Sequence, residues 1–361
     1  MLDKVINPGS PIETDALIVG AGPAGLFQAF QLGLLEISSH IVDALPYAGG
    51  QCIELYPDKP IYDIPGLPFC TGRQLVANLL EQLAPFQPVM HLGQLVSSLQ
   101  TETDGRFLVT TSSGAAFLSK CIVVAAGVGA FQPKRLAAEG IERFQGKQLF
   151  YPVGAAQGFA GKNLLIVGGD DSAIDWACAL AASPQQDKPK SITLLHRREV
   201  LQASPEALGQ FREACSAGAV TFQVGQVTGY VEENGAMIAA QVTDVEGQTR
   251  AVPLDALLVF LGLSPKLGPI ADWGLAMERK QVPVNTETFS TGISGLFAVG
   301  DINTYPGKKK LILSAFHECA LAAFGAAAHI FPGSKIQLQY TTTSTRLHTL
   351  LGVGPAASAG S

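Results

Sequence analysis

The chain has 361 residues, of which 47% are hydrophobic and 15% charged, and its formal net charge is −6 at pH 7. This length predicts two domains, since a single core rarely grows past about 250–300 residues, and the acidic balance argues against nucleic acid as a partner. No uninterrupted apolar run approaches the ~20 residues that span a bilayer. No charged-then-apolar leader opens the chain, so we expect a cytoplasmic protein that is not bound to membranes.

The cysteines and histidines have no spacing typical of a redox or metal site. No two cysteines lie three positions apart, so a C-x-x-C pair and a zinc ribbon are both excluded. We expect all the cysteines to be small buried residues in a reducing compartment. The histidines are scattered without metal-ligand spacing, and we predict no metal. The cysteines are Cys52, Cys70, Cys121, Cys178, Cys215 and Cys319.

The beginning of the chain has the pattern of a βαβ unit with a glycine-rich turn. Residues 15–20 predict a buried strand, residues 24–35 a helix and residues 38–43 a second strand. The turn reads G-x-G-x-x-G, whose glycines permit a tight turn, the approach of a pyrophosphate and close packing of the helix on the strand. Asp43 lies where an acid accepts hydrogen bonds from a ribose 2′-OH. The residues predicted at this dinucleotide site are Gly20, Gly22, Pro23, Ala24, Gly25 and Asp43.

The same pattern recurs about 150 residues later, a spacing typical of domain size. Residues 162–168 predict a strand, residues 171–183 a helix and residues 191–196 another strand. Asp170 replaces the second glycine of this motif and adds a negative charge where phosphates approach, so a degenerate structural turn is the alternative interpretation. The second strand ends in arginines instead of an acid, which favours the 2′-phosphate of NADP(H). The predicted residues are Gly168, Gly169, Ser172, Ala173, His196, Arg197 and Arg198.

The remaining segments complete two α/β domains. A Pro/Gly-rich stretch over residues 56–72 precedes a predicted helix near residues 73–84, strands within residues 88–111 and an apolar strand at residues 121–127. Later come an apolar strand at residues 254–262, a strand at residues 295–301 that ends on an acid, and a long Ala-rich helix at residues 311–330. The small residues after Gly352 are expected to fray.

Together these motifs resemble the thioredoxin-reductase-like branch of the flavoproteins that bind two dinucleotides. The resemblance rests on residues 20–25, 49–51, 168–175, 196–198 and 297–301. It implies that the first site holds FAD and that Asp301, in an Ala-x-Gly-Asp motif, lies at the ribityl–phosphate linkage. It also implies that the helix beginning near Leu311 points its positive N-terminal end toward the flavin, where the reduced ring carries negative charge.

Within this branch, both dithiol active sites are excluded by the sequence. Residues 150–159, where thioredoxin reductases carry C-x-x-C, contain no cysteine, and the residue five positions after Cys52 is Pro57, so a C-x-x-x-x-C pair is absent too. The chain therefore resembles the ferredoxin (flavodoxin)–NADP+ reductases of the thioredoxin-reductase-like type, over nearly its whole length. Supporting segments are residues 50–51, 55–57, 61–66, 171–176, 305–308 and 311–312.

This resemblance extends to residues around the flavin. It implies that Tyr56 stacks on one flavin face and Tyr340, in a C-terminal extension over residues 336–343, stacks on the other and acts as a gate. It places Thr342 near the flavin edge and implies that Gln51, Val96 and Phe131 line the FAD site. It implies no acid or base residue, and it implies a homodimer.

We therefore predict an α/β protein with two Rossmann-like, three-layer dinucleotide-binding domains. Residues 1–128 and 256–361 would form a discontinuous FAD domain, and residues 129–255 an inserted NADP(H) domain. In the family that the chain resembles, the position of Gln202 often holds a further arginine, so the preference for NADPH over NADH is expected to be modest.

The resemblance implies hydride exchange with NADP(H) and single-electron exchange with ferredoxin or flavodoxin. Because these carriers are acidic, a local basic patch is expected, at residues 308–310 or at Lys134 and Arg135. Two alternatives stay open: a diaphorase that acts on a quinone or ferric chelate, and a non-enzymatic flavin redox sensor. Monooxygenase chemistry is a weaker third.

Overall fold

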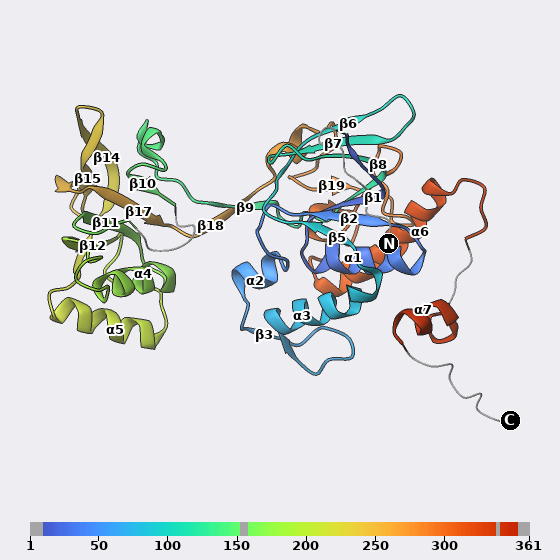
Figure 1. Cartoon of the computed structure of the whole chain (residues 1–361), viewed down its shortest axis with the longest axis horizontal. Coiled ribbons are helices and arrows are strands. Elements are labelled where there is room, and N and C mark those ends of the chain that lie inside the picture. The colour runs from blue at the N-terminus through green and yellow to red at the C-terminus, as the bar shows by residue number, and fades with distance from the viewer. Residues whose placement is uncertain (1–9, 152–157, 337–339, 353–361) are drawn as a thin grey trace. The chain divides into compact units, whose positions relative to one another are not determined.

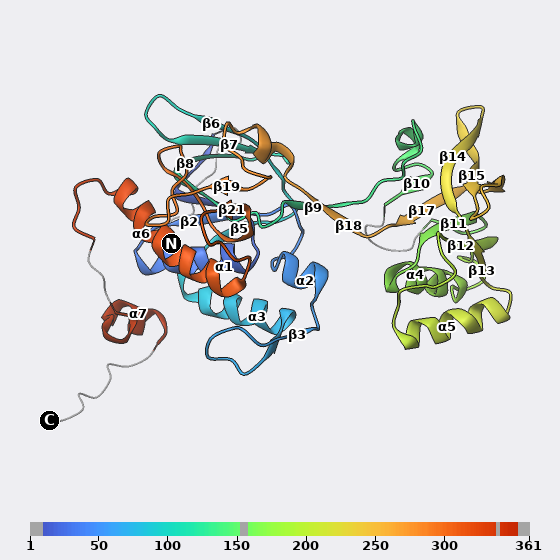
Figure 2. The same ribbon diagram turned by 180° about the vertical axis from the view of Figure 1, so that it is seen from behind.

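The computed structural model describes residues 10–151, 158–336 and 340–352. It divides the chain into two compact units (Figures 1 and 2). Unit 1 comprises Met1–Phe131 and Pro265–Ser361, and unit 2 comprises Gln132–Ser264. Unit 2 is therefore inserted into unit 1.

Unit 1 contains a seven-stranded sheet in the order β5-β2-β1-β8-β7-β6, with β20 also paired to β8. β1, β2, β5, β8 and β20 run parallel, whereas β7 is antiparallel to both of its neighbours, β8 and β6. The order reverses at β1, because β2 and β5 lie on one side and β8 on the other. Ligands bind at such a switch point, outside the carboxyl ends of the strands. The bounds are β1 Ile12–Val19, β2 Ser39–Val42, β5 Val89–His91, β6 Val96–Thr101, β7 Phe107–Thr111, β8 Ala116–Val124 and β20 Leu296–Ala298.

Three helices cover one face of this sheet: α1 (Pro23–Leu34), α3 (Gly72–Leu83) and α6 (Ile312–Ile330). α3 begins with a capping box between Thr71 and Gln74, which satisfies the first amide groups of the helix. α6 is long and apolar enough to cross a membrane by length and composition alone. However, it packs against α1 and β8 and carries the fully buried Glu318, so we interpret it as a core helix of this unit.

The smaller elements of unit 1 lie outside this sheet. The segment from Ile270 to Val282 packs on the sheet face opposite the helices. The bounds of the smaller elements are α2 Gln51–Leu55, β3 Pro60–Ile61, β4 Cys70–Thr71, η1 Ala84–Phe86, η3 Gly268–Asp272, β19 Val282–Pro283, η4 Gly300–Ile302, β21 Asn303–Thr304, η5 Thr341–Thr343 and α7 Thr345–Leu350.

Unit 2 repeats the architecture on a smaller scale. Its five-stranded parallel sheet has the order β10-β17-β11-β12-β13, which reverses at β11. α4 and α5 pack on one face, and an antiparallel sheet of β14, β15 and β16 packs on the other. The bounds are η2 Ile141–Phe144, β10 Leu149–Phe150, β11 Asn163–Gly168, α4 Asp171–Ala181, β12 Ser191–His196, α5 Pro205–Ser216, β13 Thr221–Val224, β14 Gln226–Glu233, β15 Ala236–Thr243, β16 Thr249–Pro253 and β17 Ala256–Phe260.

The chain passes between the units through β9 (Ala130–Pro133) and β18 (Leu263–Lys266), which pair with each other. The inserted unit continues past the predicted boundary at residue 255. The reason is β17, whose Ala256 pairs with Leu164 of β11, so this strand belongs to the sheet of unit 2.

Candidate functional site

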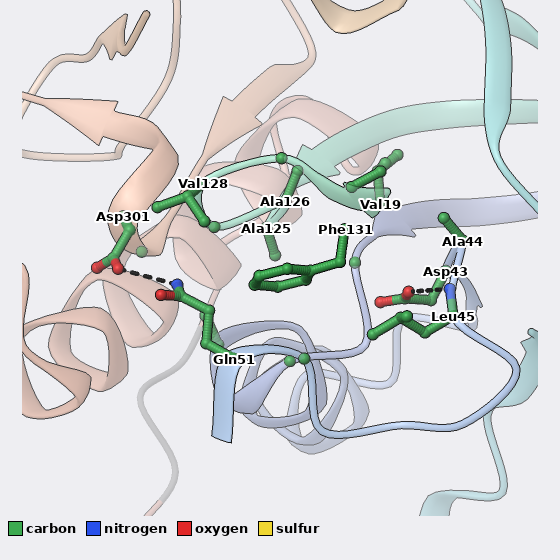
Figure 3. Close-up of a pocket in the computed structure, with 18 of the residues that line it drawn as sticks. Val19, Asp43, Ala44, Leu45, Gln51, Ala125, Ala126, Val128, Phe131 and Asp301 are labelled. Atoms are coloured by element: carbon green, nitrogen blue, oxygen red, sulfur yellow. Dashed lines mark hydrogen bonds between the residues drawn. The ribbon is translucent and has the colours of Figure 1, made fainter. Parts of the chain in front are cut away.

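A pocket opens in unit 1 at the carboxyl ends of β1, β2 and β8 (Figure 3). Its volume, including space open to solvent, is about 1110 Å³. The N-terminal ends of α1 and α6 both contribute to its wall. A site with two helix N-termini favours an anionic ligand such as a pyrophosphate.

The glycine turn between β1 and α1 has the close approaches that its sequence predicts. Gly20 has φ +115°, and a Cβ there would lie 2.4 Å from the carbonyl oxygen of Ala125. A Cβ on Gly25 would lie 1.8 Å from the Gly20 carbonyl oxygen, so only glycine lets the helix pack this closely. The Cα of Gly22 faces that of Gly50, which leaves this part of the wall without side chains. A pyrophosphate can therefore approach the backbone here.

Asp43, directly after β2, is held by two backbone amides. Its carboxylate accepts a hydrogen bond from Ala21 N–H at 2.6 Å and one from Leu45 N–H at 2.8 Å. Burial raises the pKa of Asp43, and these two hydrogen bonds act in the opposite direction. The carboxylate lines the pocket with lone pairs still available, as a ribose hydroxyl requires.

The opposite end of the pocket is built from α2 and η4. Gln51 Nε2 donates a hydrogen bond to Asp301 Oδ2 at 3.1 Å (Figure 3). A Cβ on Gly127 would lie 3.1 Å from Gln51 Nε2, so the loop after β8 approaches this pair closely. Phe131 and Val96, also predicted at this site, line the same pocket.

Tyr56, at the end of α2, also lines the pocket. Its hydroxyl accepts a hydrogen bond from the Cys52 thiol at 3.6 Å. Burial raises the pKa of Tyr56, and the bond to Cys52 and the charge of Asp301 act in the same direction. The ring is thus a neutral aromatic wall at neutral pH, suited to stack on a planar ligand.

The structure does not bring Tyr340 and Thr342 to this pocket. Neither residue lines it, and Tyr340 is 69% exposed. The chain continues into α7, where Arg346 donates to the Gly33 carbonyl at 3.1 Å, in the last turn of α1. The pocket lies at the other end of α1, a helix of 12 residues and therefore about 18 Å long. Tyr340 therefore does not line the pocket in the described chain, and its role as a flavin-stacking gate stays a prediction; residues 337–339 of the extension lie outside the described residues.

Lys308 is not a surface residue, in contrast to the basic patch predicted over residues 308–310. Its side chain is 6% exposed and pairs with the buried Glu318. Lys309 and Lys310 are exposed, and Lys310 lines the pocket. Of the other predicted patch, Arg135 pairs with Glu142 at 2.7 Å. A run of lysines in a sequence does not reveal which of them has a buried acidic partner.

The second glycine motif lies at the carboxyl end of β11 in unit 2, and α4 follows it. His196 packs against the turn: a Cβ on Gly169 would lie 2.4 Å from His196 Nδ1. Burial and the charges of Arg197 and Arg198 lower the pKa of His196. Both arginines are exposed at the end of β12, and Ser172 is exposed in the first turn of α4. All predicted residues of this site therefore gather around the start of α4 and the end of β12.

Some wall residues were not predicted from the sequence. Gly50, with φ +50°, faces Gly22, and the loop after β8 contributes Ala125, Ala126 and Val128 (Figure 3). The small residues at the end of the predicted strand 121–127 were the available signal, because side chains there would fill the space of a ligand.

The fold and the two sites define a class of oxidoreductases with two dinucleotide-binding units in one chain. A sequence profile of the pyridine nucleotide-disulphide oxidoreductase family matches residues 14–319, and the chain belongs to this family. It is 63% identical over 354 residues to a protein named ferredoxin–NADP reductase from Polaromonas naphthalenivorans, covering 97% of this chain and 96% of that protein. It is 59% identical to ferredoxin–NADP reductase 2 from Cupriavidus metallidurans, covering 96% of this chain and 94% of that protein.

Solved structures confirm the predicted fold class. The chain resembles a thioredoxin reductase from Lactococcus lactis with a TM-score of 0.52 and 22% identity, covering 88% of this chain and 99% of that one. It resembles the bacillithiol disulfide reductase from Staphylococcus aureus with a TM-score of 0.56 and 17% identity, again covering 88% of this chain and 99% of that one. At these identities the likeness shows the fold alone.

Proposed function

We propose that this protein is an FAD-dependent ferredoxin–NADP+ reductase. The observation that carries the proposal is the pocket of unit 1, where a glycine turn, Asp43 and the Gln51–Asp301 pair converge with two helix N-termini. The relatives at 57–63% identity are named ferredoxin–NADP reductase, which supports ferredoxin as the electron carrier. The sequence resemblance predicts the same activity.

The pocket fits FAD by the chemistry of its wall. The bare backbone at Gly22 and Gly50 and the first turn of α1 would hold the pyrophosphate. The Asp43 carboxylate would accept hydrogen bonds from the adenosine ribose, and Asp301 would do so from the ribityl chain. Tyr56 would cover one face of the flavin ring.

In unit 2, the start of α4 would receive the pyrophosphate of NADP(H). The exposed guanidinium groups of Arg197 and Arg198 would pair with the 2′-phosphate, since arginine matches phosphate geometry with two hydrogen bonds. In unit 1 the residue that follows β2 is Asp43, whose carboxylate would repel a 2′-phosphate. The two sites therefore differ in the dinucleotide that each accepts.

Bound FAD would couple two-electron exchange with a nicotinamide to one-electron exchange with a carrier. The protein's own residues would bind and orient the cofactor and exclude water. All six cysteines are free, and burial raises the pKa of Cys52, so this thiol beside the pocket stays protonated. This supports a reductase that passes electrons onward without a protein dithiol.

Three further expectations belong to this proposal. Free cysteines throughout the chain support a reducing compartment such as the cytoplasm. Flavodoxin would serve as well as ferredoxin, because both would need only to approach the flavin edge. The homodimer rests on the sequence resemblance, and light scattering of the FAD-loaded protein tests it.

Stopped-flow spectroscopy tests the function directly. The FAD-loaded protein is mixed with NADPH or NADH, and the reduced protein is then mixed with ferredoxin, flavodoxin, thioredoxin, a quinone or a ferric chelate. We expect fast loss of flavin absorbance with NADPH, slower loss with NADH, and reoxidation by ferredoxin or flavodoxin but not by thioredoxin. Reoxidation by quinones or ferric chelates alone would instead indicate a diaphorase. Absence of bleaching by either nucleotide would contradict the enzyme and favour a flavin sensor.

A further inference from the structure

A buried ion pair lies directly behind the wall of the FAD pocket. Lys308 is in the loop before α6, and Glu318 is within α6. Their side chains are 6% and 0% exposed. Removing two charges from water costs free energy unless both are paired and hydrogen-bonded. The contacts of this pair therefore indicate what it does in the fold.

Each oxygen of the Glu318 carboxylate has two donor groups as partners. Oε2 accepts hydrogen bonds from Gly300 N–H at 2.7 Å and from Asn303 Nδ2 at 2.8 Å. Oε1 accepts one from the Tyr305 hydroxyl at 3.0 Å and pairs with the Lys308 ammonium. Four donors on one carboxylate tie η4, β21 and the following loop to α6.

The same pair fixes the backbone of Gly300 from both sides. Lys308 Nζ donates to the Gly300 carbonyl at 2.9 Å, and Glu318 accepts the Gly300 N–H. Gly300 has φ +79°, a conformation that favours glycine, and a Cβ there would lie 3.2 Å from the Cβ of Ala24 in α1. Because the peptide bond is planar and trans, fixing the Gly300 carbonyl also fixes the direction of the Asp301 N–H.

Two of the segments that the pair connects line the pocket. Gly300 and Asp301 line one side, and residues 310–312 at the start of α6 line the adjacent side. Lys308 binds the Gly300 carbonyl and a glutamate of α6, so it fixes these two parts of the wall relative to each other. We propose that Lys308 and Glu318 are positioning residues for FAD, which hold Asp301 and the N-terminus of α6 where the cofactor needs them. This inference rests on the proposed FAD site.

The test compares Lys308→Met with Lys309→Met, which removes the neighbouring exposed lysine. FAD binding to each apoprotein is titrated by flavin fluorescence, at a temperature where circular dichroism shows that the apoprotein is folded. We expect the Kd of Lys308→Met for FAD to rise about tenfold or more and that of Lys309→Met to change less than twofold. The visible circular dichroism and midpoint potential of bound flavin should shift in Lys308→Met only.

The double variant Lys308→Met/Glu318→Gln separates positioning from plain stability, because it removes the unpaired buried charge. We expect it to regain thermal stability while its Kd for FAD stays raised. Recovery of both would overturn the inference, as would a Kd and flavin spectrum of Lys308→Met equal to those of the wild type. If neither variant folds, Tyr305→Phe removes one hydrogen bond and keeps both charges; an unchanged Kd and spectrum there would also overturn it.

These outcomes are distinct from failure of the proposed function. If the wild-type protein does not bind FAD, the proposed function fails and the question of positioning does not arise. If the wild type binds FAD and is reduced by NADPH while Lys308→Met binds FAD equally well, only the positioning role is rejected.

Discussion

At the start of α4, one carboxylate stands where a phosphate would receive hydrogen bonds. Asp170 is the N-cap of this helix, and its Oδ1 accepts the Ala173 N–H at 3.2 Å. The sequence shows only that an acid replaces a glycine; the structure shows that the acid caps the helix. The carboxylate therefore competes for the amide groups that a bound pyrophosphate would use.

We predict that Asp170→Gly lowers the KM for NADPH by roughly 3- to 10-fold, because a carboxylate near a phosphate costs on the order of 1 kcal/mol at a solvated site. Asp170→Asn keeps a capping oxygen and removes the charge, so it should give part of this gain. Asp175→Asn, which removes an exposed charge further along α4, is the matched control. Steady-state kinetics at fixed carrier measures all three. An unchanged KM in both Asp170 variants would show that the carboxylate does not face the nucleotide.

The geometry around a residue can be predicted from the sequence where it depends on local spacing. The glycines of residues 20–25 show their close approaches in the structure because the spacing of the motif alone sets the geometry. The burial of Lys308 could not be predicted from local sequence, because its partner Glu318 is in a different element and the burial of both depends on tertiary packing. The position of Tyr340 also depends on tertiary packing, because Arg346 holds the following helix α7 at the far end of α1.

Among the elements, strands and helices with strong periodicity were predicted with small shifts at their ends, whereas the β14–β15 hairpin and α5 were not predicted. Signals for both exist in the sequence. Asn234 and Gly235, both at positive φ, form the turn between β14 and β15, and Asn-Gly is a strong hairpin signal. Ser204 caps α5 ahead of Pro205 by accepting the Ala207 N–H.

One contact between β2 and β5 depends on the protonation of two imidazoles. His40 Nδ1 and His91 Nε2 are 2.9 Å apart, and the rings stack with centroids at 5.2 Å. One nitrogen must donate and the other accept, so both rings cannot be protonated without losing this hydrogen bond. Burial lowers the pKa of both residues, and the charge of His91 lowers that of His40 further.

We predict that this pair makes stability depend on pH. Because both folded-state pKa values lie below the ordinary value of about 6.5, the contribution is present above about pH 6.5 and is lost as pH falls through the folded-state values. The melting temperature of the FAD-free protein should fall by roughly 2–4 °C more between about pH 7 and pH 5 than that of His91→Phe. His317→Asn, an exposed site, is the control. Equal pH slopes in wild type and His91→Phe would contradict the assignment.

At the scale of the whole molecule, the repeat of strand, glycine turn, helix and strand predicts two dinucleotide-binding units. The structure agrees, since each sheet reverses its strand order at the strand before the glycine turn. The return point of the inserted unit was not predicted correctly. Apolar residues in β17 fit a buried strand of either sheet, and only its register with β11 assigns it to unit 2.

The net charge of the whole chain bears on how a carrier reaches the flavin. The protein carries −6 and the proposed carriers are acidic, so long-range repulsion opposes their encounter unless a local basic region attracts them. Lys308 is excluded from such a region by its burial. Lys309 and Lys310 are both exposed in the loop that leads to the pocket wall, but Lys310 lines the pocket itself, so Lys309 is the candidate in this loop that can be changed without altering the pocket wall.

We predict that Lys309→Glu lowers the rate of ferredoxin reduction roughly 3- to 10-fold at about 0.01 M ionic strength, where the Debye length is about 30 Å. The effect should nearly vanish at about 1 M, where that length is about 3 Å. Reduction of the flavin by NADPH without a carrier should stay within twofold of the wild type. Lys147→Glu makes the same change in net charge on an exposed residue of unit 2. Equal losses in both variants would show that net charge alone governs the encounter, whereas a loss confined to Lys309→Glu would assign the docking region to the approach to α6.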